Sequence, residues 1–120
     1  MLSVNKSKPL IAITLGDPSG IGPEIIAKAL SETDIHDIAR LFVLGSKESL
    51  DRAFKEVQSN TTTKIINTPS ATESSAQQIS VLETPNIMSN EFPIGELSLN
   101  SARASHTWVE TAGTLALNHE

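Results

Sequence analysis

Short apolar runs alternate along the chain with segments in which apolar residues recur at helical spacing. The runs predict two buried strands, Leu10–Leu15 and Leu41–Leu44, and two further strands, Lys64–Asn67 and Ile79–Leu82. The periodic segments predict three helices, which run from Pro23 to about Ser31, from the N-cap Ser46 to about Glu56, and from Leu99 to Asn118 after the N-cap Ser98. Strands alternating with helices indicate a three-layer α/β/α fold, with helices on both faces of a sheet.

Polar segments and the last helix complete this pattern. Residues 68–78, rich in Ser, Thr and Ala, and residues 86–95 are expected to be loops. The last helix is expected to bury one face, made of Ala102, Trp108, Val109, Ala112, Leu115 and Ala116. Trp108 is the only tryptophan, and we expect it in the core or at a subunit interface. Of the three histidines, we expect His36 and His119 on the surface and His106 to be partly buried. No two of them have the spacing of a metal site.

Composition narrows the class of protein. The 120 residues form one domain or part of one, and an aromatic share of only 3% means an aliphatic core. A net charge of −5 without a basic patch argues against a nucleic-acid partner. The absence of cysteine excludes disulfides and thiolate metal sites and fits a reducing compartment, so we expect a cytoplasmic protein. No apolar run is long enough for a membrane span, and residues 1–8 lack the core of a signal peptide and are expected to be a flexible tail.

The segment from Gly16 to Glu24 is the strongest candidate for chemistry. It joins the first predicted strand to the first helix, so it leaves free N–H groups at a helix start, where an anion can bind. Its glycines are spaced G-x-x-x-G-x-G, which matches neither the dinucleotide fingerprint nor the P-loop. An acid at Glu24 stabilises the first helical turn. From the residues alone, a tight structural turn and a direct ligand contact both stay open.

The full amino-acid sequence of this loop identifies a family more specifically than the spacing of its glycines does. The string ITLGDPSGIGPEI, at Ile13–Ile25, resembles the opening of the 4-hydroxythreonine-4-phosphate dehydrogenase family. Gly20–Glu24 also resembles the G-D-G-I-G-P-E loop of isocitrate and isopropylmalate dehydrogenases, but Asp17–Ser19 favours the first family. A second match, at Pro93–Ser98, resembles the turn before a long helix of that family. Ala102 stands where the family pattern has glycine.

This resemblance implies an isocitrate/isopropylmalate dehydrogenase-like fold, with residues 9–120 as the amino-terminal part of a dehydrogenase domain. Members oxidise 4-phosphooxy-L-threonine with NAD or NADP, with decarboxylation, in pyridoxal 5'-phosphate biosynthesis. They are homodimers that use a divalent metal such as Zn, Mg or Co, which is held by histidines from both subunits. The three histidines of this chain match none of those ligands. The resemblance therefore implies no catalytic or metal residue here, no bound cofactor and no activity for the chain alone.

The resemblance also places the loop in the wall of the cofactor cleft, with Asp17, Ser19, Gly20, Ile21 and Gly22 as the cofactor-binding residues. Each has a structural alternative. Asp17 is more simply explained by hydrogen bonds to the loop's own N–H groups, and Ser19 by a solvated position. Gly20 and Gly22 are best explained by backbone shape. Ile21 either covers the cofactor or fills the core.

Three other functions stay open. A paralogous dehydrogenase of threonate or erythronate phosphate would share this part of the sequence. A non-enzymatic α/β module that binds a small anion through the loop needs no further catalytic residues. An isopropylmalate-type dehydrogenase is disfavoured because Pro18 and Ser19 lengthen the loop.

Overall fold

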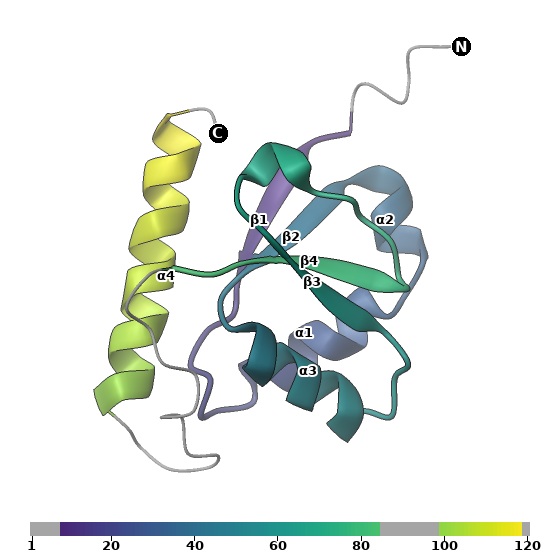
Figure 1. Ribbon diagram of the computed structural model, residues 1–120, viewed down its shortest axis with the longest axis horizontal. Helices are drawn as coiled ribbons and strands as arrows, with labels where there is room; N and C mark the ends of the chain where they lie inside the picture. The colour runs from purple at the N-terminus through teal and green to yellow at the C-terminus, as the bar shows by residue number, and fades with distance from the viewer. Residues whose placement is uncertain (1–7, 85–98, 119–120) are drawn as a thin grey trace.

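A four-stranded parallel sheet forms the centre of the molecule. The computed structural model describes residues 8–84 and 99–118. The strands are β1 (Leu10–Thr14), β2 (Arg40–Leu44), β3 (Thr62–Ile66) and β4 (Gln78–Leu82), in the spatial order β1-β2-β4-β3 (Figure 1). Every neighbouring pair is parallel, and the last residues of all four strands are in register. The carboxyl ends of the strands therefore meet at one edge of the sheet, where parallel α/β sheets bind their ligands.

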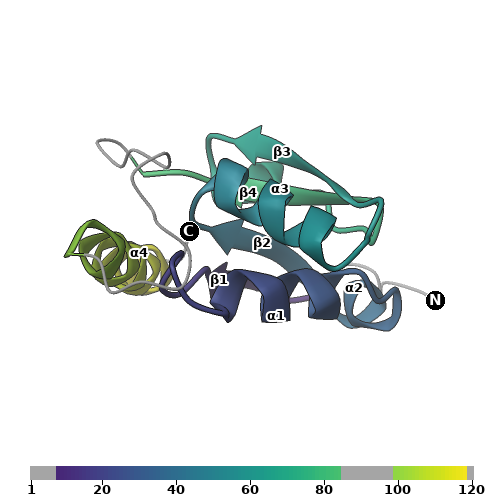
Figure 2. The ribbon, with the colours of Figure 1, turned by 90° about the horizontal axis from the view of Figure 1, so that it is seen from below.

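Helices connect and cover these strands. Helices α1 (Gly22–Leu30) and α3 (Lys47–Glu56) lie side by side (Figure 2). The short helix α2 (Asp34–Ile38) follows α1, and a 3-10 turn, η2 (Pro69–Ala71), follows β3. Helix α4 (Leu99–Leu117) packs against β1, at the edge of the sheet. No helix of the described segments has the length and apolar character needed to cross a membrane.

The core is aliphatic with few aromatic residues, as the composition predicted. It lies between the sheet and the helices, because β2 and β4 are buried along most of their length and α1 and α3 each bury one side. Its largest fully buried side chains include Leu15, Leu30, Phe42, Leu44, Leu50, Phe54, Ile79 and Trp108.

The predicted strands and long helices are confirmed, with no end shifted by more than two residues. Ser46 caps α3 as expected, because its side chain accepts a 3.2 Å hydrogen bond from the N–H of Ser49. Helix α2 was not predicted, because its five residues are too few to show a helical period. The expected loop at 68–78 contains η2. The tail up to residue 7, the loop at 86–95, Ser98 and His119 lie outside the described residues.

The buried face of α4 differs from the predicted one. Ser101, Ala104 and Trp108 are buried, a spacing of three and four residues that places them on one side of the helix. Trp108 was predicted correctly and Ala112 packs against the core, but Val109 is 55% exposed. The predicted positions Ala102 and Ala116 are also exposed. The error arose because alanine marks a buried face only weakly, whereas the buried Ser101 looked polar.

Two histidine predictions were wrong. His36 was expected on the surface, but it is 5% exposed. Its Nε2 lies 2.9 Å from the carbonyl oxygen of Leu30, at the end of α1, and its Nδ1 is hydrogen-bonded to Ser74 Oγ. His106 was expected to be partly buried, but its side chain is 74% exposed and lies 3.2 Å from Glu110. The unpredicted helix α2 is what carries His36 into the interior.

Replacing His36 with alanine should therefore lower the free energy of unfolding by about 1–3 kcal/mol, because the buried carbonyl of Leu30 and the partly buried hydroxyl of Ser74 lose their partner. The matched control is His106→Ala on the exposed side of α4, which should change stability by less than about 0.5 kcal/mol. Urea unfolding followed by circular dichroism measures both. Equal effects of the two substitutions would contradict the buried position of His36.

Candidate functional site

The loop between β1 and α1 lies at the carboxyl edge of the sheet. The N–H of Leu15 donates to the carbonyl of Leu44 at 3.1 Å, and the N–H of Gly45 donates to the carbonyl of Leu82 at 3.1 Å. These bonds continue the sheet one residue past the ends of β1 and β2. The glycine loop, which we define as residues 16–22, therefore begins where a ligand of an α/β sheet binds.

Asp17 organises the glycine loop. Its Oδ1 accepts a 2.8 Å hydrogen bond from the N–H of Ser19, and its carbonyl accepts a 3.0 Å bond from the N–H of Gly20. This is an Asx-turn, in which the aspartate side chain accepts a hydrogen bond from the backbone N–H two residues further on. The structural role predicted for Asp17 is confirmed.

The three glycines of the loop have different reasons to be glycine. Gly16 has a φ of +79°, which other residues rarely adopt. A Cβ at Gly22 would lie 2.8 Å from the carbonyl oxygen of Leu15, so the start of α1 packs too closely on the end of β1 for any side chain. Gly20 has neither constraint, since its Cβ would be 3.5 Å from the nearest atom. The prediction that backbone shape explains the glycines is confirmed for Gly22 and is wrong for Gly20.

Ser19 is not the solvated loop serine that was expected. It is 3% exposed, and its hydroxyl is hydrogen-bonded to the hydroxyl of Ser101 on α4. The two residues are 82 positions apart in the chain, so no local pattern could predict this contact. Helix α4 thus holds the glycine loop from one side.

Ile21 and Glu24 lie at the start of α1. Ile21 is 69% exposed, so it does not fill the core, which was one of its two predicted roles. It is the N-cap residue of α1, and no side chain caps the helix there. Glu24 lies in the first turn of α1, as predicted. The loop therefore presents an uncapped helix start beside an exposed isoleucine.

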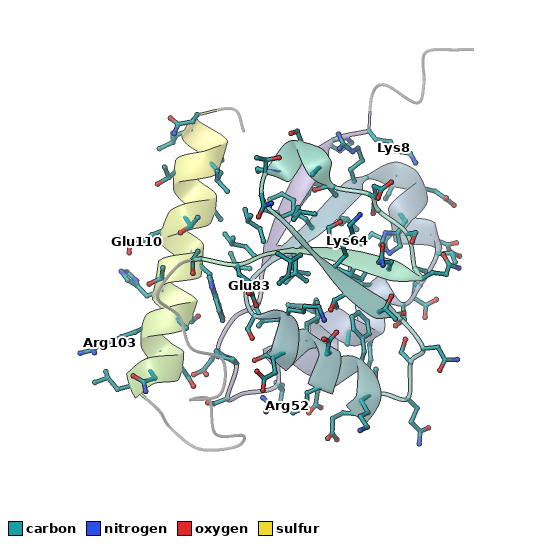
Figure 3. All side chains as sticks on the ribbon, in the orientation of Figure 1. Lys8, Arg52, Lys64, Glu83, Arg103 and Glu110 are labelled. Carbon is teal, nitrogen blue, oxygen red and sulfur yellow. The ribbon has the colours of Figure 1, made fainter. Side chains whose placement is uncertain are left out.

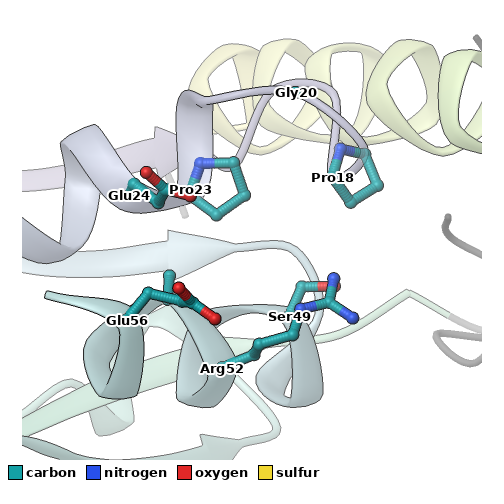
Figure 4. A pocket seen from close by; sticks show the side chains of 8 residues that line it. Pro18, Gly20, Pro23, Glu24, Ser49, Arg52 and Glu56 are labelled. Atoms are coloured by element: carbon teal, nitrogen blue, oxygen red, sulfur yellow. The ribbon is translucent and has the colours of Figure 1, made fainter. Parts of the chain in front are cut away.

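A small cavity separates the loop from α3 (Figure 4). Its volume is about 20 Å³, and it is lined by Pro18, Gly20, Pro23, Glu24, Ser49, Arg52, Ala53 and Glu56. The contributions of Ser49 and Arg52 were missed from the sequence. They lie three residues apart on α3, on the side that faces α1. This spacing is common to the residues of every amphipathic helix, so it did not mark them as part of a site.

The described residues supply no metal site. No three His, Asp or Glu side chains come together in residues 8–84 and 99–118 as ligands for an ion. The metal that the family resemblance implies therefore does not fit the described part of this chain.

A parallel sheet with this loop at its carboxyl edge places the chain in the class of parallel α/β proteins, whose ligands bind at that edge. The chain is 33% identical, over 118 residues, to the 4-hydroxythreonine-4-phosphate dehydrogenase of Trichlorobacter lovleyi, a match covering 98% of this chain and 35% of that enzyme. It is 28% identical to a Symbiobacterium thermophilum protein provisionally named D-threonate 4-phosphate dehydrogenase, covering 92% of this chain and 33% of that protein.

Solved structures agree with the sequence matches. The crystal structure of a 4-hydroxythreonine-4-phosphate dehydrogenase from Burkholderia phymatum superimposes with a TM-score of 0.87 and 26% identity, over 93% of this chain and 34% of that one. No family model matches the chain. The predicted resemblance to the 4-hydroxythreonine-4-phosphate dehydrogenase family and the predicted α/β fold are confirmed, and the chain spans about a third of the length of these relatives.

Proposed function

We propose that this chain is the amino-terminal part of an NAD(P)- and divalent-metal-dependent dehydrogenase. The enzyme oxidises 4-phosphooxy-L-threonine with decarboxylation, in pyridoxal 5'-phosphate biosynthesis, and acts as a cytoplasmic homodimer. The observation that carries the proposal is the match to the Trichlorobacter lovleyi enzyme over nearly the whole chain. Residues 9–120 form part of its dehydrogenase domain, and the chain alone is inactive because none of its three histidines matches the metal ligands of the family.

In this proposal the glycine loop forms one wall of the cofactor cleft. Its position at the carboxyl edge of the sheet and the exposure of Ile21 support this role. Asp17 and Ser19 then act by holding the loop in shape rather than by direct contact, since both are engaged within the protein. Gly22 allows the close approach of α1 and β1, and Gly20 faces the cavity beside the loop.

A second candidate is a D-threonate 4-phosphate dehydrogenase. Several relatives carry that name, and one of them is 28% identical to this chain. The two candidates differ in the acid that is oxidised, and both substrates carry a phosphate group. Both substrates therefore belong in the test.

The test is a chimera in which this chain replaces the matching third of the Trichlorobacter lovleyi enzyme. We expect turnover of 4-phosphooxy-L-threonine with NAD or NADP and a divalent metal, and none from the 120-residue chain alone. Assays with D-threonate 4-phosphate and with Zn, Mg and Co distinguish the substrate and the metal. A folded chimera without either activity, beside an active parent enzyme, would refute the proposal.

The cleft-wall role predicts a specific effect of Ile21→Ala in this chimera. Removing an exposed side chain that covers the cofactor should raise the KM for NAD(P) several-fold and leave kcat nearly unchanged. The reason is that the side chain would contact the cofactor equally in the ground state and in the transition state. Ile38→Ala is the matched control, since Ile38 is 70% exposed on α2, against 69% for Ile21. An unchanged KM in the Ile21 variant would remove Ile21 from the cofactor site.

A further inference from the structure

Unused hydrogen-bond donors gather between the glycine loop and α3. Ser49 is 2% exposed, and its hydroxyl is buried without a hydrogen-bond partner among the described residues. A buried hydroxyl without a partner loses the hydrogen bonds that it makes to water in the unfolded chain. Ser49 lines the small cavity beside the loop, so a group in that cavity could satisfy it.

Arg52 lines the same cavity, one turn along α3. The ion pairs within the described segments are Lys47–Asp51, Lys64–Glu73 and His106–Glu110, so none of them uses Arg52. Figure 4 shows Arg52 and Ser49 together beneath Pro18. Arginine presents a planar array of N–H donors that suits the oxygens of phosphate and carboxylate groups.

The start of α1 supplies the opposite wall of the cavity, through Pro23 and Glu24. No side chain caps this helix. Pro23 has no N–H to donate, so the contribution of α1 is the positive end of its helix dipole, which favours a negatively charged ligand. Three features that favour an anion, the Ser49 hydroxyl, the Arg52 guanidinium and the positive end of α1, thus lie around one cavity.

Two carboxylates lie at the other end of the cavity. Figure 4 shows Glu24 beside Pro23 and Glu56 below it on α3, away from the end below Pro18 where Arg52 and Ser49 lie. The negative charges of Glu24 and Glu56 repel an anion from their end of the cavity. A bound anion is therefore expected at the other end, beside Arg52 and Ser49. A volume of about 20 Å³ admits one water-sized group. A larger ligand can place only one oxygen inside.

We propose that Ser49, Arg52 and the start of α1 form a subsite for one oxygen of a tetrahedral oxyanion of the phosphate class. The oxygen enters the cavity, and the rest of the anion stays outside against the Arg52 guanidinium. This site requires no dehydrogenase activity, and it uses two residues of α3 that the family resemblance does not single out. An inactive chimera with intact phosphate binding would refute the proposed function alone.

The experiment is a titration of the 120-residue chain with inorganic phosphate at constant ionic strength, followed by NMR shifts of backbone amides. We expect saturable shifts at the glycine loop and at the start of α3. Arg52→Gln should weaken binding by about tenfold or more, since a charge-assisted hydrogen bond is lost. Ser49→Ala should weaken it several-fold. Glu56→Gln should strengthen it, because a repelling charge is removed. Separate titrations with NAD and with O-phospho-L-threonine show which phosphate ester uses the site.

Arg103→Gln is the matched control, because Arg103 projects from the outer side of α4 (Figure 3). It removes the same charge far from the cavity and should leave binding unchanged. Equal losses in the Arg52 and Arg103 variants would mean general charge attraction and overturn the proposal. Linear shifts without saturation, or a high-resolution crystal structure grown in phosphate with only water in the cavity, would overturn it as well.

Discussion

Replacing Trp108 with alanine is expected to lower the free energy of unfolding by about 3–5 kcal/mol, the largest effect of any single truncation in this chain. Trp108 is 0% exposed and belongs to the main core cluster, although it comes from α4, the helix at the edge of the sheet. Removing a fully buried indole leaves a cavity that the surrounding core closes only in part. Urea unfolding followed by circular dichroism measures the loss.

Val109→Ala is the control for this prediction. Val109 follows Trp108 on the same helix but is 55% exposed, so its truncation should cost less than about 0.5 kcal/mol. The fluorescence of Trp108 in the native chain gives a second readout, with an emission maximum typical of an apolar environment. Similar stability losses in the two variants would show that α4 does not pack through Trp108.

Replacing Gly22 with alanine is expected to cost about 2–3 kcal/mol, because a methyl group would be forced against the main chain. The new Cβ would lie 2.8 Å from the carbonyl oxygen of Leu15. Both atoms belong to backbone that is held in place, by β1 on one side and by α1 on the other. The strand and the helix must therefore move apart, which also changes the shape of the glycine loop. The midpoint of urea unfolding measures the cost.

Gly20→Ala tests whether this cost is specific to position 22. A Cβ at Gly20 meets its nearest atom at an ordinary 3.5 Å, and its φ is not positive. Alanine should be tolerated there within about 1 kcal/mol, with a gain possible from the stiffer unfolded chain. If Gly20→Ala proved as costly as Gly22→Ala, the close approach of Leu15 and Gly22 would not be the cause.

Local patterns predicted most of the secondary structure. Strands show continuous apolar runs and long helices show apolar residues at helical spacing over several turns, and both patterns can be read from the sequence. The same reasoning failed where an element was short or its buried residues were small and polar. Helix α2 has only five residues, and its burial of His36 depends on the end of α1 and on Ser74, 38 positions away. The buried face of α4 includes Ser101, whose hydroxyl is satisfied by Ser19 from the opposite end of the chain.

The candidate site divides in the same way. The glycine loop could be predicted because its letters are contiguous, and the role of Asp17 followed because its bonds reach only three residues along the chain. Ser49 and Arg52 could not be predicted as neighbours of the loop. They come from a different helix, and only the packing of α3 against α1 brings them there.

The sequence by itself thus determined the α/β class, the family resemblance and the position of the ligand loop. These depend on periodicity and on contiguous motifs, which are local properties of the chain. The tertiary structure alone decided which polar groups are buried and what they contact: His36 against Leu30, Ser19 against Ser101, and Ser49 beside Arg52 with no partner among the described residues. A serine or histidine reads the same in the sequence whether its side chain is solvated or buried. Only the packing of distant segments determines which partner, if any, that side chain contacts.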